Sequence, residues 1–266
     1  MVDVIVDERG FERRCGSLPM PVNRVCSLPP FGSDPNMPLW TEAEIKAVVM
    51  RSDRERSRDL FGAAWILDQL SYGSCNGHAL AGCGARTRFV GGRRDGLLFS
   101  GAYSYSKMNG GRDNGSVILD DIDVAQRDGF APLSLVSATM IYPKNQPANA
   151  DSEAAKYKGL ECYALMGLMA LRTALACRIP CIVAVMAGDN FARLNGGICG
   201  IDNGSGNHAV LVDDVLWDGT KWIYDMANSW GTRYGDGGRG YLTDGHFKQT
   251  FGPHSFVAVP AFDELR

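Results

Sequence analysis

The sequence predicts an α+β fold built in two halves, with helices in the first part of the chain and short strands in the second. Two observations support this prediction. Apolar residues recur at helical spacing in several segments before residue 180, and the pattern changes to short β-like runs after Pro180. Helices first and strands later is an order typical of α+β proteins, in which the two kinds of element occupy separate regions.

The first 57 residues differ from the rest of the chain and form a predicted N-terminal extension. They are rich in proline over residues 18–38 and then become strongly charged. Thr41 followed by Glu44 makes a capping box, in which each side chain bonds to the other residue's backbone, so a helix is expected from about Glu42. We expect residues 1–57 to be either a short proregion or an integral arm of the fold.

Three further helices are expected in the middle of the chain. After Ser74 the residues fit a largely buried helix, with Cys75 in its first turn. A second helix carries an apolar face and ends at Gly129. A third, strongly apolar helix is expected over residues 160–176. The apolar face of the second helix consists of Val117, Ile118, Ile122 and Val124.

Short strands are expected after Pro180, because each run there is rich in β-branched or aromatic residues and is bounded by Gly, Asp or Asn. Together they would form the β-rich half of the protein. The runs cover residues 181–187, 208–217, 221–228, 238–243 and 255–260.

The composition is that of an ordinary globular protein, with 45% apolar and 21% charged residues in a chain of 266. The formal net charge is only −3, and Lys and Arg are scattered, so neither a nucleic acid nor a membrane is an expected partner. The first residues lack the apolar core of a secretory signal, and no run approaches the roughly 18 apolar residues of a membrane span. We therefore expect a soluble chain without signal peptide or transmembrane segment.

The cysteines argue against a metal or redox centre. Eight of them lie at irregular spacings, and no two form the C-x-x-C pair that zinc sites and redox dithiols commonly use. No metal and no cofactor are predicted, and most of these cysteines are expected to be small buried apolar residues. They are Cys15, Cys26, Cys75, Cys83, Cys162, Cys177, Cys181 and Cys199.

Cys75 differs from the other cysteines in the residues that accompany it. Gln69 lies six positions before it, and Gly73-Ser74 lies directly before it. Asn207-His208-Ala209 opens a predicted strand, and Asn228-Ser229-Trp230-Gly231 follows the next strand. In their order and approximate spacing, these four elements resemble those of the papain family of cysteine peptidases.

The resemblance covers roughly residues 60–260 and implies a papain-like fold of two lobes with the active site between them. The N-terminal lobe would be helical, over about residues 58–143. The C-terminal lobe would be an antiparallel, barrel-like β structure over about residues 144–266. The segment from Gly111 to Pro132 and the later pair Tyr142-Pro143 are also similar to the family's sequence.

The resemblance assigns catalytic roles that fit general chemistry. Cys75 would be the nucleophile, because a helix N-terminus and a nearby imidazolium lower the pKa of a thiol. His208 would form the ion pair with it and later protonate the leaving amine. Asn228 would orient the imidazole and Trp230 would shield that contact from water, while Gln69 and the backbone N–H of Cys75 would stabilise the oxyanion. The implied reaction is cleavage of a polypeptide through an acyl-thioester.

Two glycine positions compete for contact with the substrate backbone. Gly110-Gly111 matches the family's Asn-Gly-Gly sequence, but Gly115 lies at the better distance from Gly129. We prefer Gly115, whose backbone would pair with an extended substrate and would need the space that a side chain fills. The remaining substrate-binding candidates are Asn114, Gly111, Asn207 and Trp230.

The chain also departs from the family. Asn76 stands where an aromatic residue usually follows the nucleophile, and Asn207 where an Asp often precedes the histidine. Tyr72 and Met108 replace both cysteines of a usual disulfide, which fits either a reducing compartment or a core that is stable enough without this bridge. Members without this bridge and with short leaders are typical of bacteria and viruses, including phages, so we expect a cytoplasmic or virion-associated protein whose N-terminal segment acts as an intramolecular inhibitor.

Two other functions fit parts of the sequence. A catalytically silent structural or assembly protein could keep this fold, but it would have no physical need for Gln69, Cys75, His208 and Asn228 together. A metal-binding module is the third hypothesis and lacks ligand-like clusters. The remaining histidines match no motif and are expected to be structural. They are His78, His246 and His254.

Overall fold

The computed structural model describes residues 2–158, 161–204, 206–248 and 256–261 of the chain. Among these residues, no helix combines the length and the apolar character needed to cross a membrane. The helices are α1 (Glu42–Val49), α2 (Ser57–Leu60), η1 (Ala63–Trp65), α3 (Cys75–Val90), α4 (Gly101–Met108), α5 (Ile118–Arg127), η2 (Pro143–Asn145), α6 (Ala150–Ala154), α7 (Leu168–Ala176) and α8 (Asp244–Lys248). The strands are β1 (Asp3–Val6), β2 (Glu12–Cys15), β3 (Glu161–Leu165), β4 (Cys181–Val185), β5 (Leu194–Asn195), β6 (Ile198–Cys199), β7 (His208–Trp217), β8 (Trp222–Ala227), β9 (Arg239–Thr243) and β10 (Phe256–Ala261).

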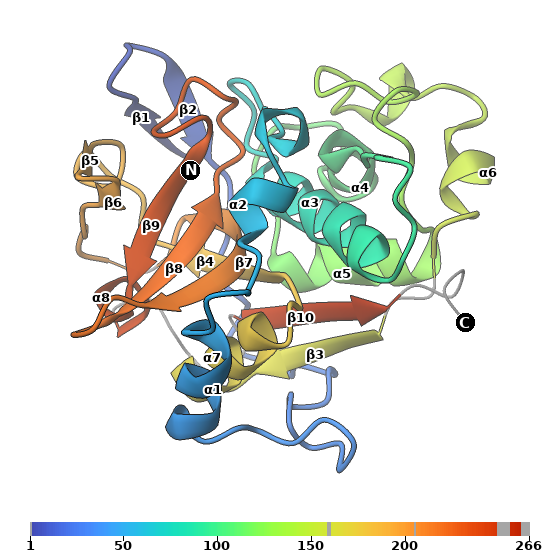
Figure 1. Cartoon of the computed structure of the whole chain (residues 1–266). Coiled ribbons are helices and arrows are strands. Elements are labelled where there is room, and N and C mark those ends of the chain that lie inside the picture. The colour runs from blue at the N-terminus through green and yellow to red at the C-terminus, as the bar shows by residue number, and fades with distance from the viewer. Residues whose placement is uncertain (1, 159–160, 205, 249–255, 262–266) are drawn as a thin grey trace.

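The expected α+β division is confirmed, with α3, α4 and α5 gathered beside the sheet (Figure 1). Helix α3 packs against α4 and α5 and also against β7. Its side chains are buried along most of its length, and Leu80 is wholly enclosed. Helix α3 is therefore the element that joins the helical part to the sheet, and its first residue is Cys75.

The sheet has the strand order β3-β10-β4-β7-β8-β9-β6-β5. Its pairs are antiparallel apart from β6 with β9. His208 is the first residue of β7 and pairs in register with Val185 of β4. Leu211 of β7 pairs with Ala227, the last residue of β8. This register brings His208 and the residue after β8, Asn228, to the same end of the sheet.

The helices expected at Glu42, Cys75 and residues 117–129 are present, and the capping box of α1 forms as predicted. The helix expected over residues 160–176 is wrong in its first part. Residues Glu161–Leu165 form β3, which pairs with β10, and only Leu168–Ala176 is helical. Gly167, with φ +149°, separates the two elements. A short apolar run is compatible with either a helix or a strand, and here pairing with the distant strand β10 makes it a strand.

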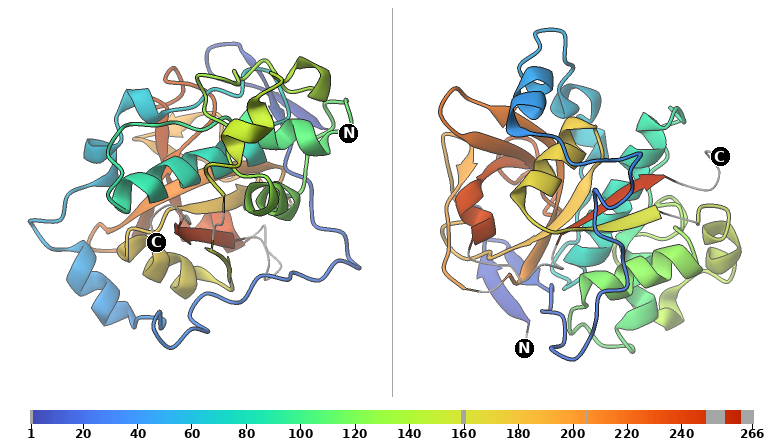
Figure 2. Two further views of the ribbon diagram at one scale, coloured as in Figure 1. Left: turned by 90° about the vertical axis from the view of Figure 1, so that its right-hand side faces the viewer. Right: turned by 90° about the horizontal axis from the view of Figure 1, so that it is seen from below.

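The segment that leads to α1 belongs to the packed body of the protein. The backbone N–H of Phe31 donates to the carbonyl of Ala164 at 2.8 Å, and Phe31 is buried. Ile45 of α1 is completely buried, and α1 packs against α7 and β7. Figure 2 shows the chain before α1 as a long trace over the outside of the molecule.

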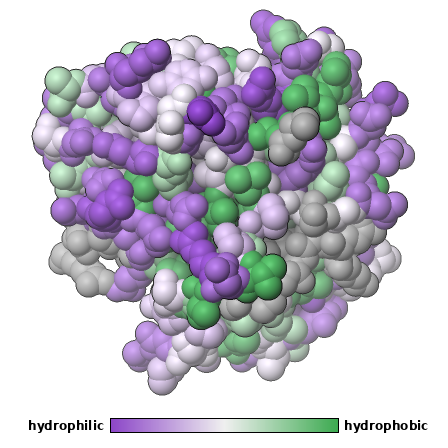
Figure 3. Space-filling model, turned by 180° about the vertical axis from the view of Figure 1, so that it is seen from behind, coloured by the Kyte–Doolittle hydropathy of each residue, from purple (hydrophilic) through white to green (hydrophobic). Residues whose placement is uncertain are grey.

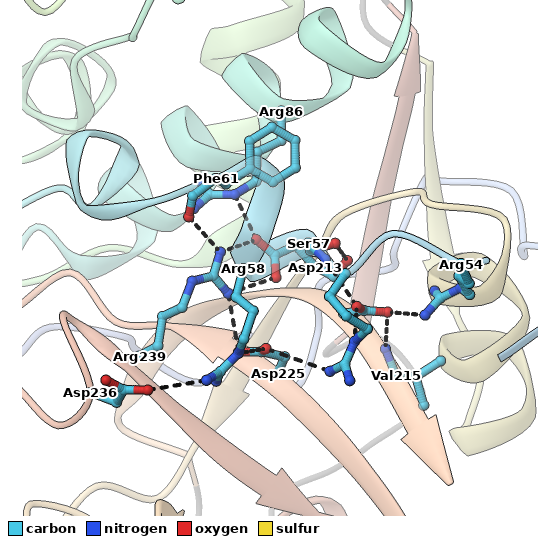
Figure 4. Close-up of polar contacts among 12 residues, drawn as sticks. Arg54, Ser57, Arg58, Phe61, Arg86, Asp213, Val215, Asp225, Asp236 and Arg239 are labelled. Atoms are coloured by element: carbon cyan, nitrogen blue, oxygen red, sulfur yellow. Dashed lines mark hydrogen bonds and ion pairs between the residues drawn. The ribbon is translucent and has the colours of Figure 1, made fainter. Parts of the chain in front are cut away.

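Buried carboxylates on β7 and β8 hold the connecting segment, α3 and the sheet together (Figure 4). Asp213 contacts Arg86 of α3 at 2.7 Å and Arg239 of β9 at 2.8 Å. Arginines between residues 54 and 58 contact the neighbouring carboxylates. A buried charge is stable only when it is paired, so each of these groups depends on its partners. The carboxylates are Asp213, Asp214 and Asp225, and the arginines of the segment are Arg54, Arg56 and Arg58.

An N-terminal hairpin was not expected from the sequence. Strands β1 and β2 pair antiparallel, with Asp3 opposite Cys15 and Val6 opposite Glu12. The hairpin lies at one end of the large sheet (Figure 1). We call residues 3–18, which comprise the hairpin and the residues that follow it, the N-terminal arm. Seen from behind the view of Figure 1, the surface carries mostly hydrophilic side chains with scattered apolar ones (Figure 3).

Candidate active site

Cys75, His208 and Asn228 meet where α3 and the ends of β7 and β8 come together. Cys75 begins α3, whose N-terminal backbone amides carry a partial positive charge. The sulfur of Cys75 takes a backbone hydrogen bond from Ala209, the residue after His208. His208 Nε2 lies 2.9 Å from Asn228 Oδ1. The three residues that the sequence motifs single out therefore form one contiguous group.

Among the described residues, the imidazole of His208 has a hydrogen-bond partner at Nε2 but none at Nδ1. Trp230 covers it, with ring centroids 4.9 Å apart and an angle of 33° between the rings. Both residues are fully buried, so water is kept from the contact between His208 and Asn228. Among the described residues, Nδ1 of His208 has no hydrogen-bond partner. That nitrogen is the one available for proton exchange with a neighbouring thiol.

Burial keeps both groups of the pair in their neutral forms. It raises the pKa of the Cys75 thiol to about 11, although backbone hydrogen bonds from Ala209 and Gly16 oppose the rise. Burial also lowers the pKa of His208 to about 4, and the Arg13 guanidinium contributes to this. Removing water disfavours the charged form of either group. In this structure a neutral thiol and a neutral imidazole are therefore favoured over a thiolate–imidazolium pair.

Gln69 lies in the loop before the nucleophile and is fixed in orientation. Ser229 Oγ donates to Gln69 Oε1 at 2.6 Å. The amide nitrogen Nε2 then donates to two backbone carbonyls, that of Tyr72 at 2.7 Å and that of Arg14 at 2.9 Å. The side-chain amide expected from the sequence to stabilise the oxyanion thus donates to a carbonyl of the N-terminal arm. Ser229 was part of a recognised motif, but nothing in the sequence pointed to this orienting contact.

The N-terminal arm crosses the site over Cys75. The Gly16 backbone takes part at both ends: its amide contacts the Cys75 sulfur, and its carbonyl accepts from the Ser116 N–H at 2.9 Å. Ser17 N–H donates to the Asn207 carbonyl at 2.9 Å, and Leu18 N–H to the Ser116 carbonyl at 2.8 Å. Cys75 has no exposed surface as a result of this enclosure. No local sequence signal marks these pairings, because they join segments far apart in the chain.

Gly16 is the point of closest approach between the arm and the loop before the nucleophile. A Cβ added at Gly16 would lie 1.9 Å from the carbonyl oxygen of Gly73 and 2.6 Å from its Cα. Both atoms belong to the backbone, so a clash could be relieved only by moving one chain segment. The arm fits because position 16 has no side chain.

The hairpin of the arm is fastened by Arg13. Its guanidinium contacts Asp7 within the hairpin at 3.1 Å and Asp68 at 3.0 Å. It also donates to the carbonyl of Trp230 at 2.8 Å. Arg13 is buried, and charge-assisted hydrogen bonds of this kind are among the stronger polar contacts. Arg13 of the arm thus contacts both the loop that carries Gln69 and the loop that follows Asn228.

The two glycine candidates differ in surroundings. A Cβ at Gly115 would lie 2.4 Å from the Gly16 carbonyl oxygen, and the residue has φ +82°. Gly111 lies in an exposed turn where an added Cβ would meet nothing within 4 Å. Asn114 is exposed next to Gly115. Another chain segment thus already approaches the backbone at Gly115, the position preferred from the sequence.

Asn76 and Asn207 are both buried and both hold backbone in place. Asn76 Nδ2 donates to the Ser116 carbonyl at 2.7 Å and so ties the start of α3 to the segment that pairs with the arm. Asn207 Nδ2 donates to Asp3 of the arm at 2.9 Å. Behind Ser116, burial raises the pKa of Asp121 to about 7. Where the family has an aromatic residue, this chain uses an amide as a structural crosslink.

Asp113 was not singled out by the sequence, yet it connects the loop before Cys75 with the segment at Gly115. Its Oδ1 accepts from Gly73 N–H at 2.9 Å and from the Tyr105 hydroxyl at 2.7 Å. The same hydroxyl oxygen accepts from Gly115 N–H at 2.9 Å. One carboxylate oxygen therefore positions the loop before Cys75 relative to the segment at Gly115.

The other histidines lie apart from this group where the structure describes them. His78 Nδ1 is 2.9 Å from the Ser74 carbonyl and is buried within α3. His246 Nδ1 accepts from Thr243 N–H at 3.0 Å. His254 lies outside the described residues. All eight cysteines fall within the described residues, and all are free thiols.

Comparison with known proteins finds a matching family profile and several structures of similar fold. The family profile described as Papain family cysteine protease matches residues 80–250, a range that includes His208 and Asn228 and begins after Cys75. No curated protein sequence matches the chain. Among solved structures, the fold is similar to xylellain, a cysteine protease from Xylella fastidiosa, with 18% identity, a TM-score of 0.66, and coverage of 97% of this chain and 98% of that one.

Two proforms from other organisms are also similar. Procathepsin B S9 from Trypanosoma congolense has 18% identity and a TM-score of 0.65, with coverage of 93% of this chain and 86% of that one. Digestive procathepsin L 3 of Tenebrio molitor has 20% identity and a TM-score of 0.58, with coverage of 74% and 66%. At these identities the likeness concerns the fold.

Proposed function

Because the chain belongs to the papain family of cysteine proteases, we propose that it cleaves peptide bonds in polypeptides through an acyl-thioester on Cys75, with His208 as general acid and base. The observation that carries this proposal is the His208 imidazole. Asn228 holds its Nε2 at 2.9 Å, its Nδ1 has no hydrogen-bond partner among the described residues, and the Cys75 sulfur contacts the next residue along the chain.

The proposed reaction has two steps. Cys75 first gives its thiol proton to His208, and the thiolate then attacks the scissile carbonyl carbon while Gln69 Nε2 and the Cys75 N–H stabilise the oxyanion. The C–N bond then breaks, and His208 gives its proton to the departing amine. In the second step a water molecule attacks the thioester while His208 takes its proton. The acid product leaves, and the proton returns to sulfur.

The substrate would take the place that the arm holds in this structure. The N–H and C=O of Ser116 pair with Gly16 and Leu18, and both groups lose these partners when the arm moves away. An extended peptide can then add along this segment, with Gly115 allowing the close approach. Asn114, Gly111, Asn207 and Trp230 remain the proposed neighbours of the substrate.

The same geometry supports the proposal that the N-terminal arm is an intramolecular inhibitor. The Arg14 carbonyl holds Gln69, and the Gly16 amide contacts the Cys75 sulfur. Burial in the closed state also favours the neutral forms of Cys75 and His208, whereas the proposed nucleophile is a thiolate. We therefore propose that residues 3–18 keep the peptidase latent and that the following part of the extension is integral to the fold.

Gly16→Ala in the full chain tests both proposals. The added Cβ would overlap the Gly73 carbonyl, and overpacking costs about 1–3 kcal/mol, so the variant should raise the population with the arm displaced by roughly tenfold or more. Labelling of Cys75 by an epoxysuccinyl peptide and hydrolysis of a fluorogenic peptide should increase together. Gly62→Ala, at an exposed glycine with nothing within 4 Å of an added Cβ, is the matched control and should behave like the wild type.

The outcomes separate the hypotheses. Hydrolysis that persists in Gly16→Ala/Cys75→Ala would remove Cys75 from the mechanism. A folded Gly16→Ala variant with a labelled Cys75 and no turnover of a peptide library would favour the silent structural protein. Unchanged labelling and hydrolysis in Gly16→Ala would refute inhibition by the arm.

A further inference from the structure

We propose that Cys15 of the N-terminal arm is a resolving cysteine for Cys75, and that under oxidising conditions the two sulfurs form a disulfide that fastens the arm over the active site. Both residues are free thiols in this structure. The inference rests on the proposed function of the site, because it describes how the proposed nucleophile and the arm that covers it are regulated. It assigns to Cys15 a chemical role that burial alone does not require.

The backbone on each side of Cys15 is bonded to the loop and the helix that carry the nucleophile. The Arg14 carbonyl accepts from Gln69 Nε2 at 2.9 Å. On the other side, the Gly16 amide contacts the sulfur of Cys75. Cys15 is the residue between these two contacts and the last residue of β2. The arm therefore carries a second cysteine into the immediate surroundings of the nucleophile.

Covalent geometry limits the distance between the two cysteines. The Gly16 nitrogen and the Cys15 Cα are separated by two bonds, or about 2.4 Å. Because that nitrogen is in hydrogen-bond contact with the Cys75 sulfur, the Cys15 Cα lies within about 6 Å of the same sulfur. The Cα atoms of a disulfide are about 4.4–6.8 Å apart, so formation of the bond requires at most a small movement of the arm.

The two thiols share one enclosed environment. Cys15 is 2% exposed, and Cys75 is completely buried. Burial raises the pKa of the Cys15 thiol, and a charge on Cys75 raises it further, because two neighbouring thiolates repel each other. The closed state thus keeps both sulfurs protonated, and the bond between them forms only after one of them has been oxidised.

A peroxide supplies the oxidising equivalents, and hydrogen peroxide is the probe for this class. It reaches Cys75 while the arm is displaced. The thiolate attacks one peroxide oxygen, the O–O bond breaks, and a sulfenic acid and one water molecule are formed. After the arm returns, the Cys15 sulfur attacks the sulfenic sulfur, the S–O bond breaks, and the Cys15 proton leaves with the hydroxide as a second water. Two thiols are thereby oxidised to one disulfide, and one hydrogen peroxide is reduced to two waters.

The disulfide makes the inhibition by the arm covalent and still reversible. A thiol reductant attacks the bond and restores both thiols. While the bond exists, the Cys75 sulfur can neither attack a substrate nor be oxidised further to the irreversible sulfinic acid. Oxidation thus keeps the protein in an inactive form that reduction recovers.

The experiment treats full-length wild type and Gly16→Ala with hydrogen peroxide in the absence of thiols. Digestion under non-reducing conditions and mass spectrometry should identify a crosslink between the peptides of Cys15 and Cys75, with the loss of two hydrogens from the chain. Alkylation of Cys75 should fall about tenfold or more and recover with dithiothreitol. No crosslink between these peptides in either protein would overturn the inference, whether Cys75 stays unmodified or becomes a sulfinic acid.

Cys15→Ser and Cys26→Ser are matched variants, because each removes one sulfur from the N-terminal extension. Cys26 lies after the arm and packs against the apolar cluster that contains Leu80 of α3. Cys15→Ser should form no crosslink, and its Cys75 should proceed to sulfinic acid, which dithiothreitol does not reverse. Cys26→Ser should behave like wild type. Recovery of Cys75 in Cys15→Ser, or a crosslink from Cys75 to Cys26 in wild type, would contradict the assignment to Cys15.

The readout separates this inference from the peptidase proposal. Peptide masses report the disulfide without any turnover. A crosslink therefore supports the inference even if no peptide is hydrolysed, in which case the peptidase proposal fails alone. Hydrolysis by a protein that forms no crosslink would leave the peptidase proposal intact and refute the role of Cys15.

Discussion

The side-chain amide of Gln69 donates a 2.9 Å hydrogen bond to the carbonyl of Arg14, a residue of the protein's own N-terminal arm. Ser229 fixes the other end of that amide. The contact places a backbone carbonyl at the donor proposed to stabilise the oxyanion. Latency and catalysis would thus use one group, and substitutions of Gln69 should weaken both.

Gln69→Ala should make Cys75 easier to label in the otherwise wild-type chain, because the arm loses its bond through Arg14. In the Gly16→Ala background the same substitution should lower kcat by about 10²-fold or more and leave KM nearly unchanged, as expected for an oxyanion donor. Labelling kinetics and steady-state hydrolysis measure the two effects. An effect on KM alone would show that Gln69 acts only in packing or binding.

The arm should open as the solution becomes acidic. Burial lowers the pKa of His208 from its ordinary value of 6.5 to about 4, and Arg13 of the arm contributes, so the closed state binds fewer protons than a state in which the arm has left. This difference stabilises the closed state fully above about pH 6.5, and the stabilisation is lost as the pH falls toward 4. For Cys75 the pKa is raised from 9.0 to about 11, so closure is favoured below 9 and weakens as the pH rises toward 11.

The ratio of Cys75 labelling rates in Gly16→Ala and wild type measures this effect, because the intrinsic pH dependence of the reagent largely cancels. The ratio should be largest between about pH 6.5 and pH 9 and should fall on the acid side. A ratio that is constant between pH 4 and pH 8 would contradict coupling between His208 and the arm.

Asn228 should orient His208 without titrating. In the Gly16→Ala background, kcat/KM should follow a bell-shaped pH profile that reports the Cys75–His208 pair. Asn228→Ala should reduce activity far less than His208→Ala and keep the bell. Asn228→Asp should move the alkaline limb upward, since a carboxylate stabilises the imidazolium. A downward shift, or activity that rises steadily with pH, would refute the pair.

Removing Arg239 should destabilise the fold strongly. Arg239→Met leaves Asp213 with Arg86 as its remaining close arginine and removes a second contact to Asp225. Taking one partner from a buried ion pair costs about 3–5 kcal/mol of unfolding free energy. Urea denaturation should show this loss. Arg51→Met is the control, because its pair with Asp53 is exposed, and it should change stability by less than about 1 kcal/mol.

The sequence was informative where elements are long or strongly patterned. The strand beginning at His208 could be predicted because its apolar run is bounded by turn residues, and α1 because Thr41 and Glu44 form a capping box. The resemblance of the motifs to those of the papain family selected His208 and Asn228, which the structure shows in hydrogen-bond contact. Glu161–Leu165 was predicted incorrectly as helix, because only pairing with β10 distinguishes the two periods.

The N-terminal arm could not be found from the sequence, for a physical reason. Its strands are four residues long, and much of their surface is exposed, so they carry little hydrophobic pattern. What holds the arm is nonlocal: Arg13 against Trp230, and Gly16 against Ser116. Asp113 was missed similarly, because its role arises from Gly73 and Tyr105, which reach it from other turns of the chain.

The connection between the arm and the body gives the proposed latency a further property. Leu18 is bonded beside the site, and Phe31 is bonded to Ala164 in the sheet, with Val22 and Val25 exposed between them. This short tether gives the arm an effective concentration on the order of millimolar at the cleft. Even weak intrinsic affinity then suffices for closure, and dilute substrate competes poorly. One cut in the tether would let the arm diffuse away into bulk solution and would turn reversible inhibition into lasting activity.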